Sequence, residues 1–431
     1  MRLFDTIVAP ITGAPPAAVA WIRLSGPEAW RIASLVFSPW PPEVLPRMAV
    51  YGRYGSGDDG LALPFESSHS YTGEESVELS MHGSRASVSF VIEACLAAGA
   101  RLAEAGEFTQ RAFLNGRLDL SQAEGVRESC EAQTEAQLRL GAATREGAVG
   151  REVGAFRERL LKMLGAVEAS IDFSEEIGEF DRVSATLEVQ SILRSIDRLL
   201  NNAEAGRIMR EGFRVAIVGP PNAGKSSLMN ALLGMDRSIV TDVPGTTRDY
   251  IEETADFEGV PVVLIDTAGL RDTEDLVESL GVQRSRALAA HADEIWFVYD
   301  IQEGWSPSLE SQVKGFGRPV TVLANKSDIG GSGPGKRISA VTRDGLNELI
   351  EDIASRSEAQ PGVPLINRRH EPILLAARET LEALELSLED APEDLLSVLI
   401  TQTTMQLGEI TGETAQPDMI EKIFHDFCVG K

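Results

Sequence analysis

The stretch G-P-P-N-A-G-K-S, residues 219–226, decides the fold of the middle of this chain. It fits the phosphate-binding pattern G-x-x-x-x-G-K-[S/T], and it lies between a strand-like apolar run and a helix-like run. In that context the glycines let backbone amides face a β-phosphate, and the helix N-terminus adds a favourable dipole. The stretch predicts a phosphate-binding loop. A Gly-rich turn is the alternative when the motif stands alone.

Short apolar runs recur on both sides of this loop and alternate with helix-like segments. Each run is strand-length and is bounded by Gly, Pro or Asp. Strand–helix alternation with fully apolar strands indicates a mostly parallel, doubly wound sheet. The runs are F-R-V-A-I-V-G, V-P-V-V-L-I-D, E-I-W-F-V-Y-D, P-V-T-V-L-A-N and K-R-I-S-A.

The flanks of this region have a different character. The segments 119–207 and 366–431 are rich in Ala, Glu and Leu with helical spacing, so we expect them to pack together as one helical bundle. Residues 1–118 contain alternating stretches such as S-V-E-L-S-M-H, which predict a separate α+β domain. The fold class expected is therefore multidomain, α/β and α+β. A Ras-like P-loop domain over 208–365 is inserted between the two helical segments.

Composition narrows the class of protein. The chain has 431 residues with 66 acidic and 40 basic side chains, a net charge of −26. A protein that grips nucleic acid alone usually carries a basic face, so any nucleic acid would be held largely by a basic partner. We expect no membrane segment and a cytoplasmic location. The three cysteines, Cys95, Cys130 and Cys428, predict free thiols rather than a disulfide framework.

Three further motifs follow the phosphate loop, each at the end of an apolar run. Lys225 would reach the β- and γ-phosphates and Ser226 would bind Mg²⁺. D-T-A-G at 266–269 offers a carboxylate to that Mg²⁺. N-K-S-D at 325–328 offers a carboxylate to the two donors on a guanine edge, and Ser339 and Ala340 end the next run. Ligands bind such sheets at the carboxyl ends of strands, so the order predicts GTP binding.

The hydrolytic step departs from the Ras pattern. A Gln that orients the attacking water follows D-T-A-G in Ras-like switches. Leu270 stands at that position here. Another group must orient the water, and the acidic candidates that follow closely are Asp272, Glu274, Asp275 and Glu278. A solvated acidic surface is the alternative for most of them.

The motifs together resemble one family. N-A-G-K-S-S, T-D-V-P-G-T-T-R-D, D-T-A-G-L-R, G-E-F-T-Q-R-A-F-L-N-G-R-L-D-L-S-Q-A-E and the terminal F-C-V-G-K are similar, in this order and over the full length, to the MnmE (TrmE) family of tRNA modification GTPases. The resemblance implies an N-terminal folate-binding and dimerising domain at 1–118. It also implies a helical domain from 119–207 and 366–431, and an inserted G domain at 208–365.

The resemblance also implies an activity. Members work with a FAD-containing partner, MnmG, in a heterotetramer or larger complex built on a homodimer. They add a carboxymethylaminomethyl or aminomethyl group to carbon 5 of the wobble uridine, position 34, of certain tRNAs. A tetrahydrofolate such as 5-formyl-tetrahydrofolate is the expected one-carbon donor.

For the nucleotide, the resemblance implies a potassium ion in the place of an arginine finger. Its ligands would be Asn222 and the carbonyls of Thr241 and Val243, and Thr247 would join Ser226 on Mg²⁺. Glu278 would orient the water, with Arg248 and Asp249 as further catalytic residues. The GTP site expected comprises Gly219, Asn222, Ala223, Gly224, Lys225, Ser226, Ser227, Thr241, Thr246, Thr247, Asp266, Gly269, Asn325, Lys326, Asp328, Ser339 and Ala340.

For the folate, the resemblance implies Arg23, Glu78, Arg117 and Lys431. Strand-face charges are the alternative for Arg23 and Glu78. Members usually carry a Gly-rich segment before this Arg and an H-G-G motif. Here the two read T-G-A-P-P-A-A-V-A at 12–20 and H-G-S at 82–84, so we expect an altered pocket or dimer contact.

Cys428 lies three residues before the end of the chain. A C-a-a-X lipidation signal is a poor fit, because Lys is not a typical last residue for it. The resemblance implies a catalytic thiol beside the folate, and a structural thiol in the tail is the alternative. The sequence offers one candidate base to activate it, His425, three residues earlier and one helical turn away.

Two other functions compete with tRNA modification. A ribosome-assembly switch of the Era or Der kind shares the G-domain motifs, although neither a basic RNA-binding module nor a duplicated G domain is visible in the sequence. The other is folate-dependent aminomethyl transfer in which GTP is only regulatory. Analysis of tRNA separates the first, and folate dependence of a purified reaction separates the second.

Overall fold

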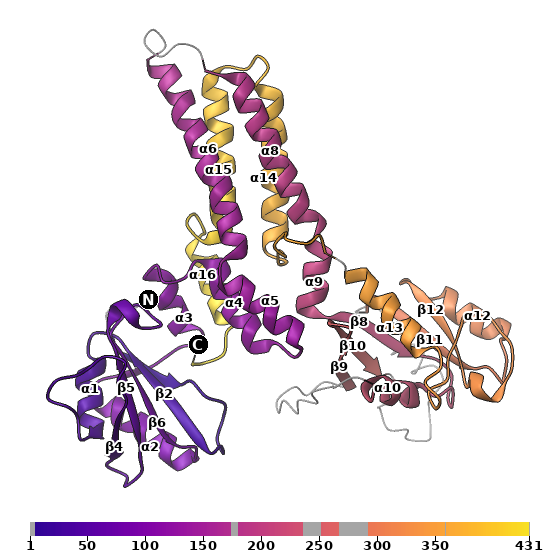
Figure 1. Ribbon diagram of the computed structural model, residues 1–431, viewed down its shortest axis with the longest axis horizontal. Helices are drawn as coiled ribbons and strands as arrows, with labels where there is room; N and C mark the ends of the chain where they lie inside the picture. The colour runs from indigo at the N-terminus through magenta and orange to yellow at the C-terminus, as the bar shows by residue number, and fades with distance from the viewer. Residues whose placement is uncertain (1–4, 174–179, 236–250, 267–291, 358, 431) are drawn as a thin grey trace. The chain divides into compact units, whose positions relative to one another are not determined.

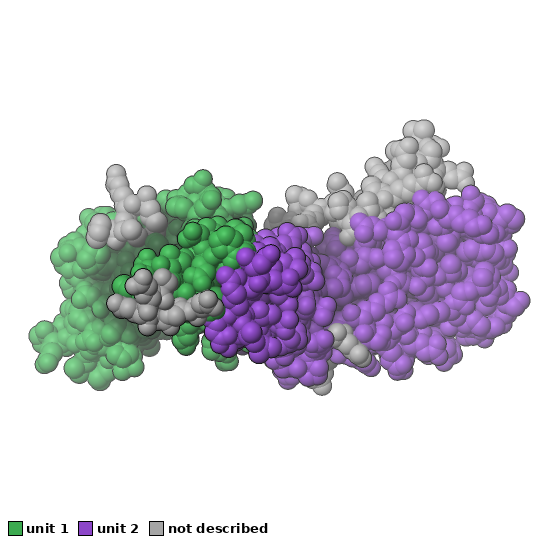
Figure 2. All heavy atoms as spheres, turned by 90° about the horizontal axis from the view of Figure 1, so that it is seen from above, with its two compact units in different colours: residues 1–127, 144–180, 391–431 green, residues 128–143, 181–390 purple. Residues whose placement is uncertain are grey.

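A computed structural model describes residues 5–173, 180–235, 251–266, 292–357 and 359–430. The chain divides into two compact units, coloured separately in Figure 2. The first unit contains 1–127, 144–180 and 391–431. The second contains 128–143 and 181–390. Each unit thus joins segments that lie far apart in the sequence.

The N-terminal part of the first unit is a mixed sheet with helices, as the alternating stretches predict (Figure 1). Over the described residues its strand order is β3-β4-β5-β6-β2-β1-β7. In register, Arg23 on β2 lies opposite Glu78 on β6. The elements are β1 (Ile7–Pro10), β2 (Val19–Ser25), α1 (Ala29–Val36), β3 (Phe37–Ser38), β4 (Val50–Tyr54), β5 (Asp59–Phe65), β6 (Ser76–His82), α2 (Arg85–Ala97), β7 (Arg101–Leu102) and α3 (Glu107–Leu114).

Helices from both flanks complete the first unit. α6 (Ala148–Asp172) packs along α15 (Glu393–Thr411). Both helices bury one apolar stripe at three- and four-residue spacing, which is the pattern of a helix with one core-facing side. α4 (Leu120–Glu131), α5 (Glu135–Arg145) and α16 (Pro417–His425) are the other helices of the flanks that have residues in this unit.

The second unit has a helix pair of the same kind. α8 (Arg182–Asn201) packs along α14 (His370–Ser387). Asp181 caps α8, because its side chain accepts a hydrogen bond from the Ser184 amide. Each pair takes one helix from each flank, so helices of the two flanking segments pack together within each unit. That both pairs form one helical domain stays a prediction. α9 (Ala203–Glu211) then leads into the sheet of this unit.

The sheet of the second unit is doubly wound. Over the described residues its strand order is β13-β12-β11-β8-β10-β9, and every pairing is parallel except that of the edge strand β9. β10 and β11 are buried along their whole length, and β8 between them is buried except at Arg214, as the apolar runs predict. The elements are β8 (Phe213–Val218), α10 (Lys225–Leu233), β9 (Ile251–Phe257), β10 (Val260–Asp266), β11 (Glu294–Asp300), α12 (Pro307–Lys314), β12 (Val320–Asn325), β13 (Lys336–Arg337) and α13 (Leu346–Ala354).

Two local expectations need correction. The run K-R-I-S-A is a strand only over Lys336–Arg337, because the Ser339 amide turns back to bond the Asp344 carbonyl. α16 ends at His425, so helical spacing does not connect His425 with Cys428. The three cysteines are free thiols, as predicted. Within the described residues, no helix is long and apolar enough to cross a membrane.

Candidate functional site

The phosphate loop joins the end of β8 to the start of α10, and two of its glycines are required by close packing. A Cβ on Gly219 would lie 2.0 Å from the Val298 carbonyl oxygen. A Cβ on Gly224 would lie 2.3 Å from Nδ2 of Asn325, and both glycines have positive φ. Asn222 also has a positive φ, 59°, a conformation that Asn tolerates better than most residues. The loop therefore adopts the turned backbone that the motif predicts.

The cationic and metal-binding candidates converge at the end of this loop. Lys225 Nζ donates to the carbonyls of Gly219 and Pro220, at 3.0 and 2.9 Å. Ser226 Oγ donates to Oδ2 of Asp266 across 3.2 Å. A hydroxyl and a carboxylate oxygen side by side are ligands that suit Mg²⁺. Ala223 is buried behind the loop, and Ser227 lies on the first turn of α10.

The N-K-S-D motif, which was predicted to bind the base, is attached directly to the phosphate loop. Asn325, buried at the end of β12, donates from Nδ2 to the Ala223 carbonyl at 2.8 Å. Its Oδ1 accepts a hydrogen bond from the Ala340 amide at 3.2 Å. Ser339 Oγ donates to Oδ1 of Asp328 at 2.6 Å and so orients that carboxylate. Asn325 thus links the phosphate loop to the segment around Ala340 and fixes their relative positions.

Lys326 has a partner that the sequence analysis did not identify. Its Nζ lies 2.6 Å from Oδ2 of Asp300, which ends β11. Burial raises the pKa of the Asp300 carboxyl, but the hydrogen bond from Lys326 and that from the Gln302 amide outweigh it, so this pKa lies below its ordinary value. Asp300 ends an apolar strand as Asp266 and Asn325 do. This position at a strand end is the sequence feature from which a role for Asp300 at the site could have been predicted.

Arg23 and Glu78 form an ion pair on the sheet of the first unit. Nε and Nη2 of Arg23 both donate to Oε1 of Glu78, at 3.0 and 2.8 Å. The guanidinium carbon lies 4.8 Å from the centre of the Tyr71 ring and 5.3 Å from that of Phe108. Neither aromatic residue was predicted, because no local sequence pattern connects Tyr71 or Phe108 with Arg23. Arg117 lies on the loop between α3 and α4, where its Nη1 donates to the Ser68 carbonyl at 3.2 Å.

The unusual segment at 12–20 forms an ordered turn before β2. The Ala17 amide donates to the Gly83 carbonyl at 2.9 Å, and the Gly83 amide donates back to the Ala18 carbonyl at 3.3 Å. A Cβ on Gly83 would lie 2.3 Å from the Ala17 carbonyl oxygen, so this glycine is required. Ser84, the departure in H-G-S, accepts from the Ser87 amide and caps α2.

The C-terminal tail lies against the start of α3 within the first unit. Ala105 and Val429 form an isolated antiparallel bridge, and the Gly106 amide donates to the Cys428 carbonyl at 3.3 Å. Phe424 and Phe427 are buried just before it, in a cluster with Leu120. The backbone of Cys428 is therefore held against the N-terminal part of the chain, and its side chain is exposed.

Comparison with known proteins decides the family. The sequence model of the MnmE helical domain matches residues 120–428, and that of the GTP-binding protein TrmE N-terminus matches residues 6–117. This chain belongs to the MnmE family of tRNA modification GTPases. Relatives named tRNA modification GTPase MnmE include the protein of Chloroflexus aurantiacus, at 42% identity over 99% of this chain and 100% of the relative. Those of Moorella thermoacetica and Aquifex aeolicus are 40% identical, over 100% and 99% of this chain respectively and 100% of each relative.

Several site residues expected of an MnmE family member lie outside the described residues. They include the candidate water-orienting acid, the switch residues with their potassium and magnesium ligands, and the last residue of the chain. They are Glu278, Arg248, Asp249, Thr241, Val243, Thr246, Thr247, Gly269 and Lys431. Their roles remain predictions.

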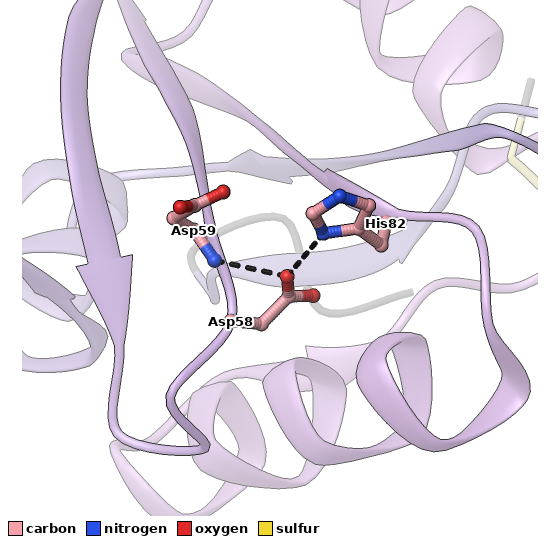
Figure 3. Close-up of side chains that lie close together, drawn as sticks. All are labelled: Asp58, Asp59 and His82. Atoms are coloured by element: carbon pink, nitrogen blue, oxygen red, sulfur yellow. Dashed lines mark hydrogen bonds and ion pairs between the residues drawn. The ribbon is translucent and has the colours of Figure 1, made fainter.

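Two carboxylates and an imidazole in the first unit form a cluster that was not predicted from the sequence. Asp58, Asp59 and His82 bring their ligand atoms within 4.8 Å of one another (Figure 3). Oδ1 of Asp58 lies 2.5 Å from Nδ1 of His82 and accepts from the Asp59 amide, while its Oδ2 accepts from Ser87. These donors already occupy both oxygens of Asp58. The arrangement therefore ties the β4–β5 turn to β6 and α2.

This cluster gives a pH-dependent prediction. The hydrogen bond to Asp58 raises the pKa of His82 above its ordinary 6.5. Burial raises the pKa of Asp58, but the hydrogen bonds from Ser87 and His82 outweigh it and hold this pKa below its ordinary 3.8, so the pair stabilises the fold fully between about pH 4 and pH 6.5. This stabilisation is lost as the pH rises through the higher folded-state pKa. In an NMR titration, Asp58→Asn is expected to move the His82 midpoint down. An unchanged midpoint would show that the ion pair is absent in solution.

Proposed function

We propose that this protein is a potassium-dependent GTPase that modifies carbon 5 of the wobble uridine of certain tRNAs together with a FAD-containing partner, MnmG. The modification is a carboxymethylaminomethyl or aminomethyl group, and a tetrahydrofolate donates the one-carbon unit. The protein acts as a homodimer within a larger complex in the cytoplasm. Because its net charge is −26, most of the contacts that bind the tRNA are made by the partner.

The observation that carries the proposal is the attachment of the base-binding segment to the phosphate loop through Asn325. The Asp328 carboxylate, oriented by Ser339, offers two acceptor oxygens to the donors N1–H and 2-NH₂ of guanine. Adenine has no such pair of donors. Ser226 and Asp266 fit Mg²⁺ at the phosphate end, so the two ends together favour Mg·GTP.

The potassium dependence rests on Asn222. Its side chain is exposed beside the phosphate loop, and its amide oxygen is a neutral ligand of the kind that suits a monovalent cation. A bound cation near the β- and γ-phosphates supplies positive charge where negative charge develops during hydrolysis. The chain's own part is to hold the backbone at Asn222 in its turned conformation. Thr241 and Val243 complete the proposed ligand set.

The folate proposal rests on the Arg23–Glu78 pair. Both hydrogen bonds between the two side chains use a single oxygen, Oε1 of Glu78, so Oε2 of Glu78 and Nη1 of Arg23 remain available among the described residues. One acceptor beside one donor complements the edge of a pterin, which carries an amino group beside a carbonyl group. Arg117 and Lys431 would meet the negatively charged glutamate tail. Cys428 would supply a thiol near the one-carbon unit.

Replacing Arg23 tests the folate site. Arg23→Ala removes a charge-assisted hydrogen bond from Nη1 worth about 1.5–3 kcal/mol, so we expect 5-formyl-tetrahydrofolate to bind about 10- to 150-fold more weakly. Titration calorimetry on the full chain measures this change. Arg53→Ala, an exposed arginine on β4, is the matched control and leaves binding unchanged. Equal binding by wild type and Arg23→Ala would contradict the assignment.

A purified reaction tests the whole proposal. It contains this protein, the FAD-containing partner, unmodified tRNA, GTP, K⁺ and a tetrahydrofolate, and mass spectrometry of nucleosides detects the product. We expect no modified wobble uridine when either this protein or the folate is omitted. Product without the folate would remove the one-carbon role. Product at the full rate without GTP would make the nucleotide merely regulatory.

A further inference from the structure

The first turn of α3 contacts four different parts of the first unit through four successive residues, 106–109. Side chains on a helix point about 100° apart, so one turn can reach partners in several directions. The turn is closed by the hydrogen bond from the Gln110 amide to the Gly106 carbonyl at 2.9 Å. A closed turn moves as one body, so its four contacts are mechanically linked.

Gly106 holds the tail. Its amide donates to the Cys428 carbonyl, and a Cβ at this position would lie 2.4 Å from the Phe424 carbonyl oxygen. Its φ is 67°, which disfavours a side chain independently of the contact. The neighbouring bridge between Ala105 and Val429 extends the same attachment. The path of the tail beside the sheet therefore depends on this turn.

Glu107 fixes the turn to the sheet. Its carboxylate accepts from Arg101 at 2.7 and 2.9 Å and from Arg111 at 2.9 Å. Arg111 is almost fully buried and also donates to Asp5 and to Glu74. Breaking one partner of a buried ion network is strongly destabilising, so these groups stay together. The network locks the turn to the segment around Glu74, three residues after Tyr71.

Phe108 and Thr109 reach the Arg23–Glu78 pair. The Phe108 ring lies beside the Arg23 guanidinium, and Thr109 Oγ1 is 2.9 Å from the hydroxyl of Tyr71, the second ring at that guanidinium. A cation flanked by aromatic rings is held by cation–π attraction as well as by its ion pair. The direction of Arg23 is thus set by the same turn that holds the tail.

We propose that residues 106–109 form a positioning element that fixes the position of Cys428 relative to the Arg23–Glu78 pair. If either the tail or the ion pair is displaced, the position of the other then changes as well. This rests on the proposed folate site, which it extends by naming what aligns that site with the tail. Glu107 and Gly106 are positioning residues, because neither touches the proposed ligand atoms. The element explains how the C-terminal stretch can be held in place beside a site on the sheet.

The test uses the full chain and two readouts. One is the rate at which iodoacetamide labels Cys428, measured by mass spectrometry as a ratio to Cys130, an exposed cysteine in the same molecule. The other is the affinity for 5-formyl-tetrahydrofolate. The variants are Gly106→Ala and Glu107→Gln. Gly57→Ala is the control, because Gly57 has a similarly positive φ of 88° with nothing within 4 Å of its Cβ position.

We expect both variants to change the labelling ratio severalfold and to weaken folate binding about tenfold or more, and the control to change neither. A changed ratio in Gly106→Ala with wild-type affinity would overturn the proposal. If the wild type binds no folate, the folate site fails separately. In that case the labelling ratio of Glu107→Gln alone tests the positioning role, because the Glu107 side chain does not contact the tail. An unchanged ratio in this variant overturns the positioning role. Glu107→Gln also decides if Gly106→Ala does not fold.

Discussion

Asp328→Asn is expected to lower GTP hydrolysis at subsaturating nucleotide by about 10²–10³-fold and to create activity with xanthosine triphosphate. The Asp328 carboxylate accepts two charge-assisted hydrogen bonds from guanine in our account, each worth about 1.5–3 kcal/mol. An Asn side chain places an N–H group opposite the 2-amino group of guanine, which is itself a donor. The same N–H group can donate to the carbonyl oxygen that xanthine carries at this position. Ser339 Oγ can still donate to the remaining oxygen, so the segment keeps its orientation.

Steady-state kcat/KM with the two nucleotides measures this switch. The variant carries its own control, because activity with xanthosine triphosphate shows that the domain is folded. Loss of activity with both nucleotides would indicate structural damage rather than altered base recognition. Unchanged activity with GTP would show that Asp328 does not contact the base.

Asn222→Gly is expected to remove potassium stimulation, lowering the K⁺-supported rate by about 10²-fold to the rate in Na⁺. Gly adopts the positive φ of 59° observed at Asn222 without strain, so the substitution deletes the amide oxygen while the loop is retained. GTP affinity should change little, because the phosphate-binding amides stay in place. The affinity is the control for the rate.

Hydrolysis rates in KCl and NaCl at equal ionic strength test this prediction. A variant that keeps its full response to K⁺ would exclude Asn222 as a ligand. Equal wild-type rates in the two salts would remove the potassium proposal itself. Neither result would affect the base-recognition argument, which uses different residues.

Much of the G domain was predictable from sequence because its signals are local. The strands at Phe213–Val218 and Glu294–Asp300 are apolar runs, one followed by Gly219 and the other ending at Asp300. Motifs at successive strand ends then converge, since the carboxyl ends of parallel strands share one edge. The pairing of helices from both flanks followed from composition and periodicity alone.

The surroundings of Arg23 were not predictable in this way. Phe108 is far from Arg23 in the sequence, and their contact depends on the register of the sheet and on the docking of α3. The bridge between Ala105 and Val429 joins the two ends of the chain, which no periodicity reports. Likewise Asp58 meets His82 only because β5 and β6 pair in one register. Such sites require tertiary structure.

Nucleoside analysis of bulk tRNA from a strain lacking this protein tests its role in tRNA modification. We expect the modified wobble uridine to be absent, to return with the wild-type gene, and to stay absent with Asp328→Asn. That pattern would tie a guanine-dependent activity of this chain to the modification. A normal level of modified uridine in the strain lacking the protein would contradict the account and favour a role in ribosome assembly.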